Sequence, residues 1–267
     1  MSSIVTQQGI VHYESFGQGA PVILLHGWLG SWGLWQPTME ALGGRYRCYA
    51  LDFWGFGESG KKRASYDVTD FMELVKQFMD ALGIEAAPII GHSMGGTTAL
   101  GTAIRYPERV RRVCVIGSPI VGTSLSVFLR LAGVPWIGSL ARGLPGVLKA
   151  ALRLCAPLIT RHPARWYPMI ERDLSQTTVA SFFSSIGSLA QTDLRPQLGA
   201  LHMPVAGVYG LRDVIVQPRQ HAVLQAGVPQ ARLTTMAGSG HFPMLDEPAL
   251  YLDHVQAFLE STAHDPV

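Results

Sequence analysis

Two patterns of apolar residues alternate along most of the chain. Short, mostly apolar runs, of which residues 21–26 are the clearest, are typical of strands covered on both faces. Between them, residues 68–82 and 94–106 have apolar side chains every three or four positions, and this spacing predicts helices. Further strands are expected within 4–15 and at 46–52, 88–91, 110–116, 203–209 and 231–236, with a closing helix at 248–261. The alternation predicts an α/β fold with a doubly wound, mostly parallel sheet.

The alternation stops between residues 119 and 198. That segment has helical periodicity, no clear strand, and eight Lys+Arg against three Asp+Glu. We therefore expect an α/β core formed by residues 1–118 and 199–267, with 119–198 inserted as a helical cap. Lys149 and Arg153 could contact anionic lipid headgroups through this cap, although a solvated helix face is the favoured interpretation.

Composition narrows the class of protein. The 267 residues are 48% hydrophobic and 15% charged, which excludes a disordered chain. A net charge of +2 argues against nucleic-acid binding. The first residues lack a signal peptide and no apolar run reaches the roughly 18 residues of a membrane span, so we expect a cytoplasmic protein. The three cysteines are far apart and indicate buried free thiols, without a disulfide framework or a zinc site.

The most specific motif is Gly91-His92-Ser93-Met94-Gly95, which matches G-x-S-x-G. It lies between a predicted strand and a predicted helix, where a sharp turn raises the serine hydroxyl above the sheet. The five residues alone could form a simple glycine-rich turn, but this context favours a nucleophile at Ser93. The Met94 backbone N–H then becomes one expected donor to a reaction oxyanion, and the Trp28 N–H, in the loop after the strand at 21–26, is the second.

A serine nucleophile needs a base, and the base needs an acid that orients it. His241 follows the last predicted strand and Asp213 follows the one before, so both are expected at the same sheet edge as Ser93. The chain order Ser93, Asp213, His241 is the order expected for a nucleophilic serine on a strand-to-helix turn with its acid and base. His221 and His254 stay open as alternative bases, and an Asp after glycine is also a common turn residue.

Taken together, these segments resemble the α/β-hydrolase superfamily. The resemblance covers nearly the whole chain outside the insertion and is carried by His26-Gly27, 52–59, 91–96, 210–213 and 240–248. It implies a serine-nucleophile hydrolase with a helical cap, and it makes Asp52 a turn-forming residue. Haloalkane dehalogenases and epoxide hydrolases of the superfamily carry Asp at the nucleophile position. Carbon–carbon bond hydrolases more often have Asn and Trp where this chain has His92 and Phe242.

The resulting expectation is a carboxylic-ester hydrolase that forms an acyl-enzyme on Ser93. Its substrate is expected to be a small apolar ester of short-to-medium chain length, with Trp28, Trp32 and Trp136 as pocket walls. No cofactor and no metal are expected. A carbon–carbon bond hydrolase or haloperoxidase-like enzyme with the same triad stays open, as do a non-catalytic small-molecule receptor and, last, an interaction scaffold. The natural substrate and the oligomeric state stay open too.

Overall fold

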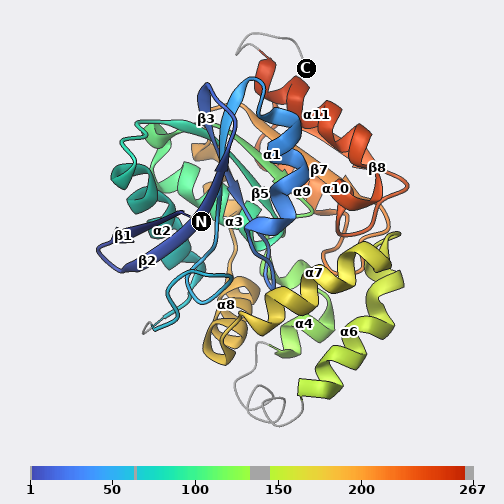
Figure 1. The fold of residues 1–267 in the computed structure, drawn as a ribbon. Helices are drawn as coiled ribbons and strands as arrows, with labels where there is room; N and C mark the ends of the chain where they lie inside the picture. The colour runs from blue at the N-terminus through green and yellow to red at the C-terminus, as the bar shows by residue number, and fades with distance from the viewer. Residues whose placement is uncertain (1, 63–64, 133–144, 262–267) are drawn as a thin grey trace.

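The computed structural model describes residues 2–62, 65–132 and 145–261. Within these residues, eight strands form one sheet in the order β1-β2-β4-β3-β5-β6-β7-β8 (Figure 1). The strands are β1 (Ser2–Thr6), β2 (Gly9–Phe16), β3 (Ala20–Leu25), β4 (Tyr46–Leu51), β5 (Ala87–His92), β6 (Val110–Ile116), β7 (Val205–Gly210) and β8 (Arg232–Met236). The strands from β3 to β8 are mutually parallel, and β2 runs antiparallel to both β1 and β4. The predicted doubly wound, mostly parallel sheet is thereby confirmed.

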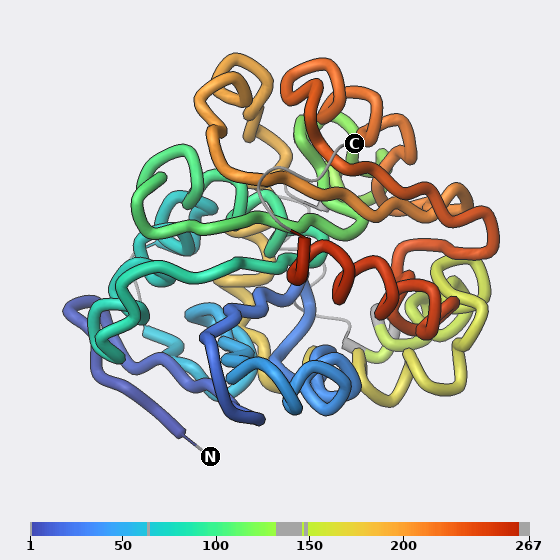
Figure 2. The backbone as a smooth tube through the Cα atoms, turned by 90° about the horizontal axis from the view of Figure 1, so that it is seen from above, coloured from blue at the N-terminus to red at the C-terminus, as the bar shows by residue number. Residues whose placement is uncertain are grey.

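The N-terminal segment predicted as strand is a hairpin. Its two strands pair antiparallel, with Thr6 opposite Gly9 at the turn. Figure 2 shows this hairpin, in dark blue, at one side of the molecule. Its strands therefore extend the sheet at the edge opposite β8.

Helices cover both faces of the sheet. Their bounds are α1 (Gln36–Leu42), α2 (Val68–Ala81), α3 (Met94–Arg105), α9 (Gln220–Gly227), α10 (Pro243–Asp246) and α11 (Pro248–Glu260). Alternate residues of β3 point to opposite faces: Ile23 and Leu25 join a core cluster with α2 and α3, whereas Val22 and Leu24 join one with α1 and α11. All four side chains are fully buried. The continuous apolar run at 21–26 is thus explained by a strand packed on both sides.

The segment between β6 and β7 contains α4 (Val127–Ala132), α6 (Pro145–Ile159), α7 (Pro163–Ser175) and α8 (Val179–Gln191), which we call the inserted helices. They gather beyond one end of the sheet (Figure 1), with α6 packed on α7 and α4 on α8. Among the described residues, no helix is long and apolar enough to cross a membrane.

Both basic residues considered for lipid contact are engaged within the inserted helices. Lys149 Nζ lies 3.2 Å from Glu171 Oε1, and the Arg153 guanidinium lies over the Tyr167 ring at 5.5 Å. Each of these contacts joins α6 to α7. The two cations therefore brace the helix pair.

The expectation of three buried thiols is wrong for one cysteine. Cys48 and Cys114 are buried in β4 and β6, and burial raises the pKa of each thiol to about 12. Cys155 is exposed on α6, because this helix buries Ala156 and Ile159 instead. At the end of α6 the buried position is therefore Ala156, one residue after the cysteine that the sequence suggests.

This difference predicts the thiol chemistry of the folded chain. An aromatic disulfide reagent should modify only Cys155 in the native protein, since the thiolate is the reactive form and needs access. The number of modified thiols per chain is measured by the absorbance of the released aromatic thiolate, with and without denaturant. All three thiols should react after unfolding. In a Cys155→Ser variant the native protein should not react. Fast native modification of that variant would contradict the burial of Cys48 and Cys114.

Candidate active site

Ser93 occupies a strained turn between β5 and α3. Its backbone has φ 52° and ψ −121°, and its N–H donates to Ile116 O on β6 at 2.8 Å. The flanking glycines permit this geometry: a Cβ on Gly91 would lie 2.2 Å from Gly95 O, and one on Gly95 would lie 2.2 Å from Leu25 O. The turn therefore depends on glycine at both positions of the motif, and it holds Ser93 at the carboxyl end of β5.

His241 and Asp213 form a buried hydrogen-bonded pair. His241 Nδ1 donates to Asp213 Oδ2 at 2.7 Å. The other carboxylate oxygen accepts the N–H groups of Ile215 and Val216 at 2.8 and 2.9 Å, which fixes the acid. With the proton on Nδ1, the Nε2 of a neutral His241 carries a lone pair and can accept a proton. Gly117, at φ 54°, passes against the pair without a side chain.

The fold brings this pair beside Ser93. The three residues follow the parallel strands β5, β7 and β8, of which β5 and β7 are separated by β6, so they lie at the carboxyl end of the sheet. His92, directly before Ser93, donates from Nε2 to His241 O at 2.8 Å, and the two imidazole centroids lie 4.8 Å apart. No hydrogen bond joins Ser93 Oγ to the His241 ring in the described part of the chain.

The other histidines near the sheet ends have structural partners. Burial, with His241 close by, lowers the pKa of His92 well below its ordinary value, so it is a neutral donor. Burial likewise lowers the pKa of His26, whose Nδ1 donates to Gly27 O while Nε2 accepts the Phe53 N–H.

Both alternative bases hydrogen-bond elsewhere. His221 Nδ1 lies 2.7 Å from Pro218 O, within the chain that leads into α9. His254, on α11, lies 3.4 Å from Thr234 Oγ1. Neither contact involves the turn that carries Ser93, whereas the His241 backbone is hydrogen-bonded to His92 in that turn.

The two expected oxyanion donors flank Ser93. Met94 is the first residue of α3, so its N–H lies at the positive end of a 12-residue helix. Gly27 passes so close to Ser93 that a Cβ there would lie 3.0 Å from Ser93 Cβ, which brings the following Trp28 to the same place. In the described residues, neither N–H donates to another group. The Trp28 indole donates to Phe182 O on α8 at 2.9 Å, and the two rings lie 4.4 Å apart.

Asp52 holds the next part of the same loop. Its fully buried carboxylate accepts the N–H groups of Trp32 and Glu58 at 2.7 and 2.9 Å, and His12 Nδ1 at 2.9 Å. The carboxylate thus joins three separate segments. The Trp32 indole packs against the core cluster of α1 and α11. Trp136, the third expected pocket wall, lies outside the described residues.

Asp173 is a residue of this region that sequence reasoning missed. It projects from α7, is fully buried, and accepts the Ser31 hydroxyl at 2.8 Å and Arg172 Nη2 at 3.0 Å. Burial raises the pKa of its carboxyl group. The sequence of α7 gives no signal of this contact, because the partner, Ser31, lies 142 positions away from Asp173.

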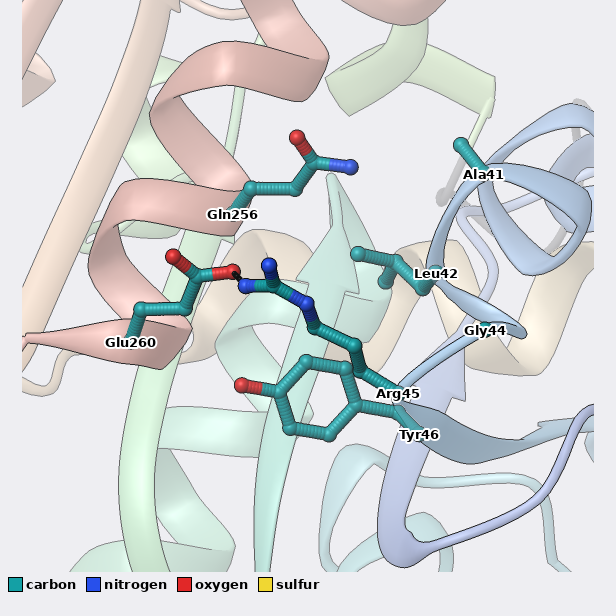
Figure 3. Close-up of a pocket in the computed structure, with 7 residues that line it drawn as sticks. All are labelled: Ala41, Leu42, Gly44, Arg45, Tyr46, Gln256 and Glu260. Carbon is teal, nitrogen blue, oxygen red and sulfur yellow. Dashed lines mark hydrogen bonds and ion pairs between the residues drawn. The ribbon is translucent and has the colours of Figure 1, made fainter.

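A surface pocket lies at the other end of the sheet. It is lined by α1, the start of β4 and α11, and Arg45 and Glu260 form an ion pair across it (Figure 3). Because Tyr46 begins β4, this pocket opens at the amino ends of the parallel strands. Ser93 lies at the carboxyl ends, so the pocket is separate from the candidate active site.

Comparison with known proteins identifies the family. Residues 20–248 match the family described as the alpha/beta hydrolase fold. The chain belongs to that family. A pimeloyl-[acyl-carrier protein] methyl ester esterase of Vibrio campbellii is 29% identical over 262 residues, which cover 93% of this chain and 98% of that protein. An uncharacterized protein of Mycobacterium tuberculosis is 31% identical over 264 residues, covering 92% of this chain and 77% of its own.

Solved structures show the same fold for this hydrolase. An esterase from Exiguobacterium antarcticum superposes with a TM-score of 0.87 at 20% identity, covering 97% of this chain and 99% of that one. At such identity the likeness concerns the fold alone. The arrangement of the sheet and its helices is therefore a feature of a fold that many chemistries share.

His12 lies among the carboxylates of Asp52, Glu58 and Glu14, and we call these four residues the Asp52 cluster. The cluster should make the stability of this α/β hydrolase depend on pH. Burial disfavours a charged His12, but the hydrogen bond to Asp52 and the charges of Asp52, Glu58 and Glu14 outweigh it and raise the pKa of His12. Protonated His12 thus stabilises the fold fully below the unfolded-state pKa of about 6.5, and this contribution disappears as the pH rises through the raised value.

Replacement of His12 by Gln should therefore cost more stability in acid. Urea unfolding should give a larger difference in free energy between wild type and His12→Gln at about pH 6 than at about pH 9. The same change at the exposed His202 controls for the loss of a histidine. A difference that is equal at both pH values, or that grows with pH, would contradict the charged pairing of His12 with Asp52.

Proposed function

We propose that this protein is a serine hydrolase of carboxylic esters, with Ser93 as nucleophile, His241 as base and Asp213 as the orienting acid. The observation that carries the proposal is the strained turn that holds Ser93 at the sheet edge where the buried His241–Asp213 pair lies. A relative named as a methyl ester esterase supports the choice of substrate class.

Acylation begins when Ser93 Oγ attacks the ester carbonyl carbon while His241 Nε2 takes the hydroxyl proton. The carbonyl oxygen becomes negative, and the free N–H groups of Met94 and Trp28 stabilise it by hydrogen bonds. The N-terminus of α3 adds a favourable dipole. Asp213 stays ionised and stabilises the imidazolium that forms.

Collapse of the tetrahedral intermediate breaks the bond to the alcohol oxygen, and His241 gives its proton to the leaving alcohol. A water molecule then attacks the acyl-enzyme, and His241 Nε2 takes a proton from it. The second intermediate releases the carboxylic acid as the proton returns to Ser93 Oγ. No cofactor or metal has a step in this sequence.

The proposed substrate is apolar and of short-to-medium chain length. In this proposal, residues 119–198 act as a cap, and the Trp28 and Phe182 rings, tilted by 53° to each other, form one wall where α8 meets the core. Trp32 and Trp136 are the other proposed walls. An aromatic wall beside the oxyanion donors favours hydrocarbon over charged substituents, because burying a charge there is costly.

The first test is turnover of p-nitrophenyl esters from acetate to palmitate. The wild type should hydrolyse them with a maximum at short-to-medium acyl chains, and Ser93→Ala should lower kcat by at least about 10³-fold, since the nucleophile is lost. Circular dichroism checks that the variant is folded. Activity that survives in Ser93→Ala would contradict the assignment of the nucleophile.

A second substrate class separates the competing reactions. A ring-cleavage dienoic acid should be turned over far more slowly than the best ester. Faster turnover of the dienoic acid would favour a carbon–carbon bond hydrolase with the same residues. A single stoichiometric burst, without turnover of either substrate, would favour a receptor.

A further inference from the structure

The loop that carries His241 is hydrogen-bonded to the inserted helices as well as to the core. The His241 N–H donates to Ile159 O, at the end of α6, at 3.1 Å. Gly240 lies so close to that carbonyl that a Cβ would stand 2.4 Å from Ile159 O. On the core side, His92 Nε2 donates to His241 O. The backbone of His241 is therefore held from two directions, one of which is the end of α6.

Asp246 links the same two parts through its carboxylate. Oδ2 accepts the N–H of Gly240, directly before His241, at 2.7 Å. Oδ1 accepts the Thr160 hydroxyl at 2.5 Å and the Arg161 N–H at 2.7 Å, both just beyond the end of α6. The Asp246 side chain is 7% exposed. A carboxylate in this position accepts all three donors, as an ionised acid with two acceptor oxygens can.

We propose that Asp246 is a positioning residue for His241 that couples the imidazole to the end of α6. The proposal rests on the function proposed for His241. Between these two described residues, Asp246 makes no hydrogen bond to the imidazole ring, and it acts through Gly240 on one side and Thr160 on the other. The base and the inserted helices consequently keep one fixed relation, so a displacement of α6 displaces His241.

Two substitutions separate the arms of this link. Asp246→Asn keeps the volume but turns one acceptor into an amide donor that faces an N–H, so one arm must break. Thr160→Val removes the hydroxyl that the residue after α6 donates to Asp246, and it keeps the shape of the side chain. Glu247→Gln is the matched control, because Glu247 is the adjacent carboxylate and accepts the hydroxyl of Ser239 in the same loop at 2.6 Å.

The first readout is steady-state kinetics on the best p-nitrophenyl ester. Asp246→Asn should lower kcat by about 10²-fold and Thr160→Val by about tenfold, because a shift of about 1 Å in a catalytic group has costs of this order. KM should change little, since no contact with substrate is lost. Once Asp246 is Asn, adding Thr160→Val should lower kcat less than about twofold, because residues of one network are not additive.

The second readout needs no turnover. The downfield proton NMR signal of His241 Nδ1–H, identified by its loss in Asp213→Asn, should shift or broaden in Asp246→Asn and return toward wild type in Asp246→Glu. Unfolding midpoints of all variants show that each is folded under the assay conditions. A merely structural role of Asp246 would lower the midpoint and leave the signal and kcat of the folded protein unchanged.

Three results would overturn the coupling: an equal kcat loss in Glu247→Gln, a full independent effect of Thr160→Val in the Asp246→Asn background, or an unchanged Nδ1–H signal. Failure of the proposed function looks different. A wild type that neither hydrolyses esters nor reacts with a fluorophosphonate at Ser93 would refute the esterase assignment. The NMR comparison would then still decide whether Asp246 positions the imidazole.

Discussion

The first turn of α3 lies directly against the backbone at the ends of β3 and β5, and the rest of the site depends on this contact. A side chain on Gly95 would collide with Leu25 O, and one on Gly96 would lie 1.9 Å from Ser118 Oγ. The approach forces Ser93 into a positive φ, which costs about 1–3 kcal/mol in a non-glycine residue. The buried strands on both sides hold the strain, so the serine has one position above the sheet.

Four histidines are buried in the described part of this protein, and the hydrogen-bond partners of each one determine its role. His26 and His92 face carbonyl oxygens, and burial keeps them neutral. Burial disfavours a charged His12, but Asp52 and the nearby carboxylates outweigh it and raise the pKa of His12. His241 donates a hydrogen bond from Nδ1–H to Asp213, which leaves Nε2 available. A residue type with one ordinary pKa thus supplies backbone supports, a partner for a buried carboxylate and a candidate base.

Local patterns made the sheet and the first candidate residues predictable. The apolar run of β3, the helical spacing of α2 and the glycines around Ser93 each reflect a constraint on neighbouring positions, so the sequence displays them. Helix α1 was not predicted from the sequence, because it contains Pro37 and its seven residues are too few for a clear periodicity. Cys155 was misplaced because one turn of an amphipathic helix hardly distinguishes adjacent positions.

The links from Asp173 to Ser31 and from Asp246 to Thr160 join residues 142 and 86 positions apart. Such pairs leave no periodic trace, and only the folded chain shows them.

The chain leaves the sheet for the inserted helices and returns to it at almost the same point. Val121 and Asp193 form a β-bridge, Gly122 N–H donates to Thr192 O at 2.7 Å, and Leu194 N–H donates to Ile120 O at 3.0 Å. With entrance and exit adjacent, the stretch between them is a cassette that recombination can exchange without disturbing a strand. Contacts with the core limit the exchange, because any replacement has to offer a carbonyl to His241 N–H, donors to Asp246, an acceptor to the Ser31 hydroxyl and an acceptor to the Trp28 indole. Evolution of new specificity in this scaffold is therefore least constrained in those parts of the cassette that make no such contact with the core.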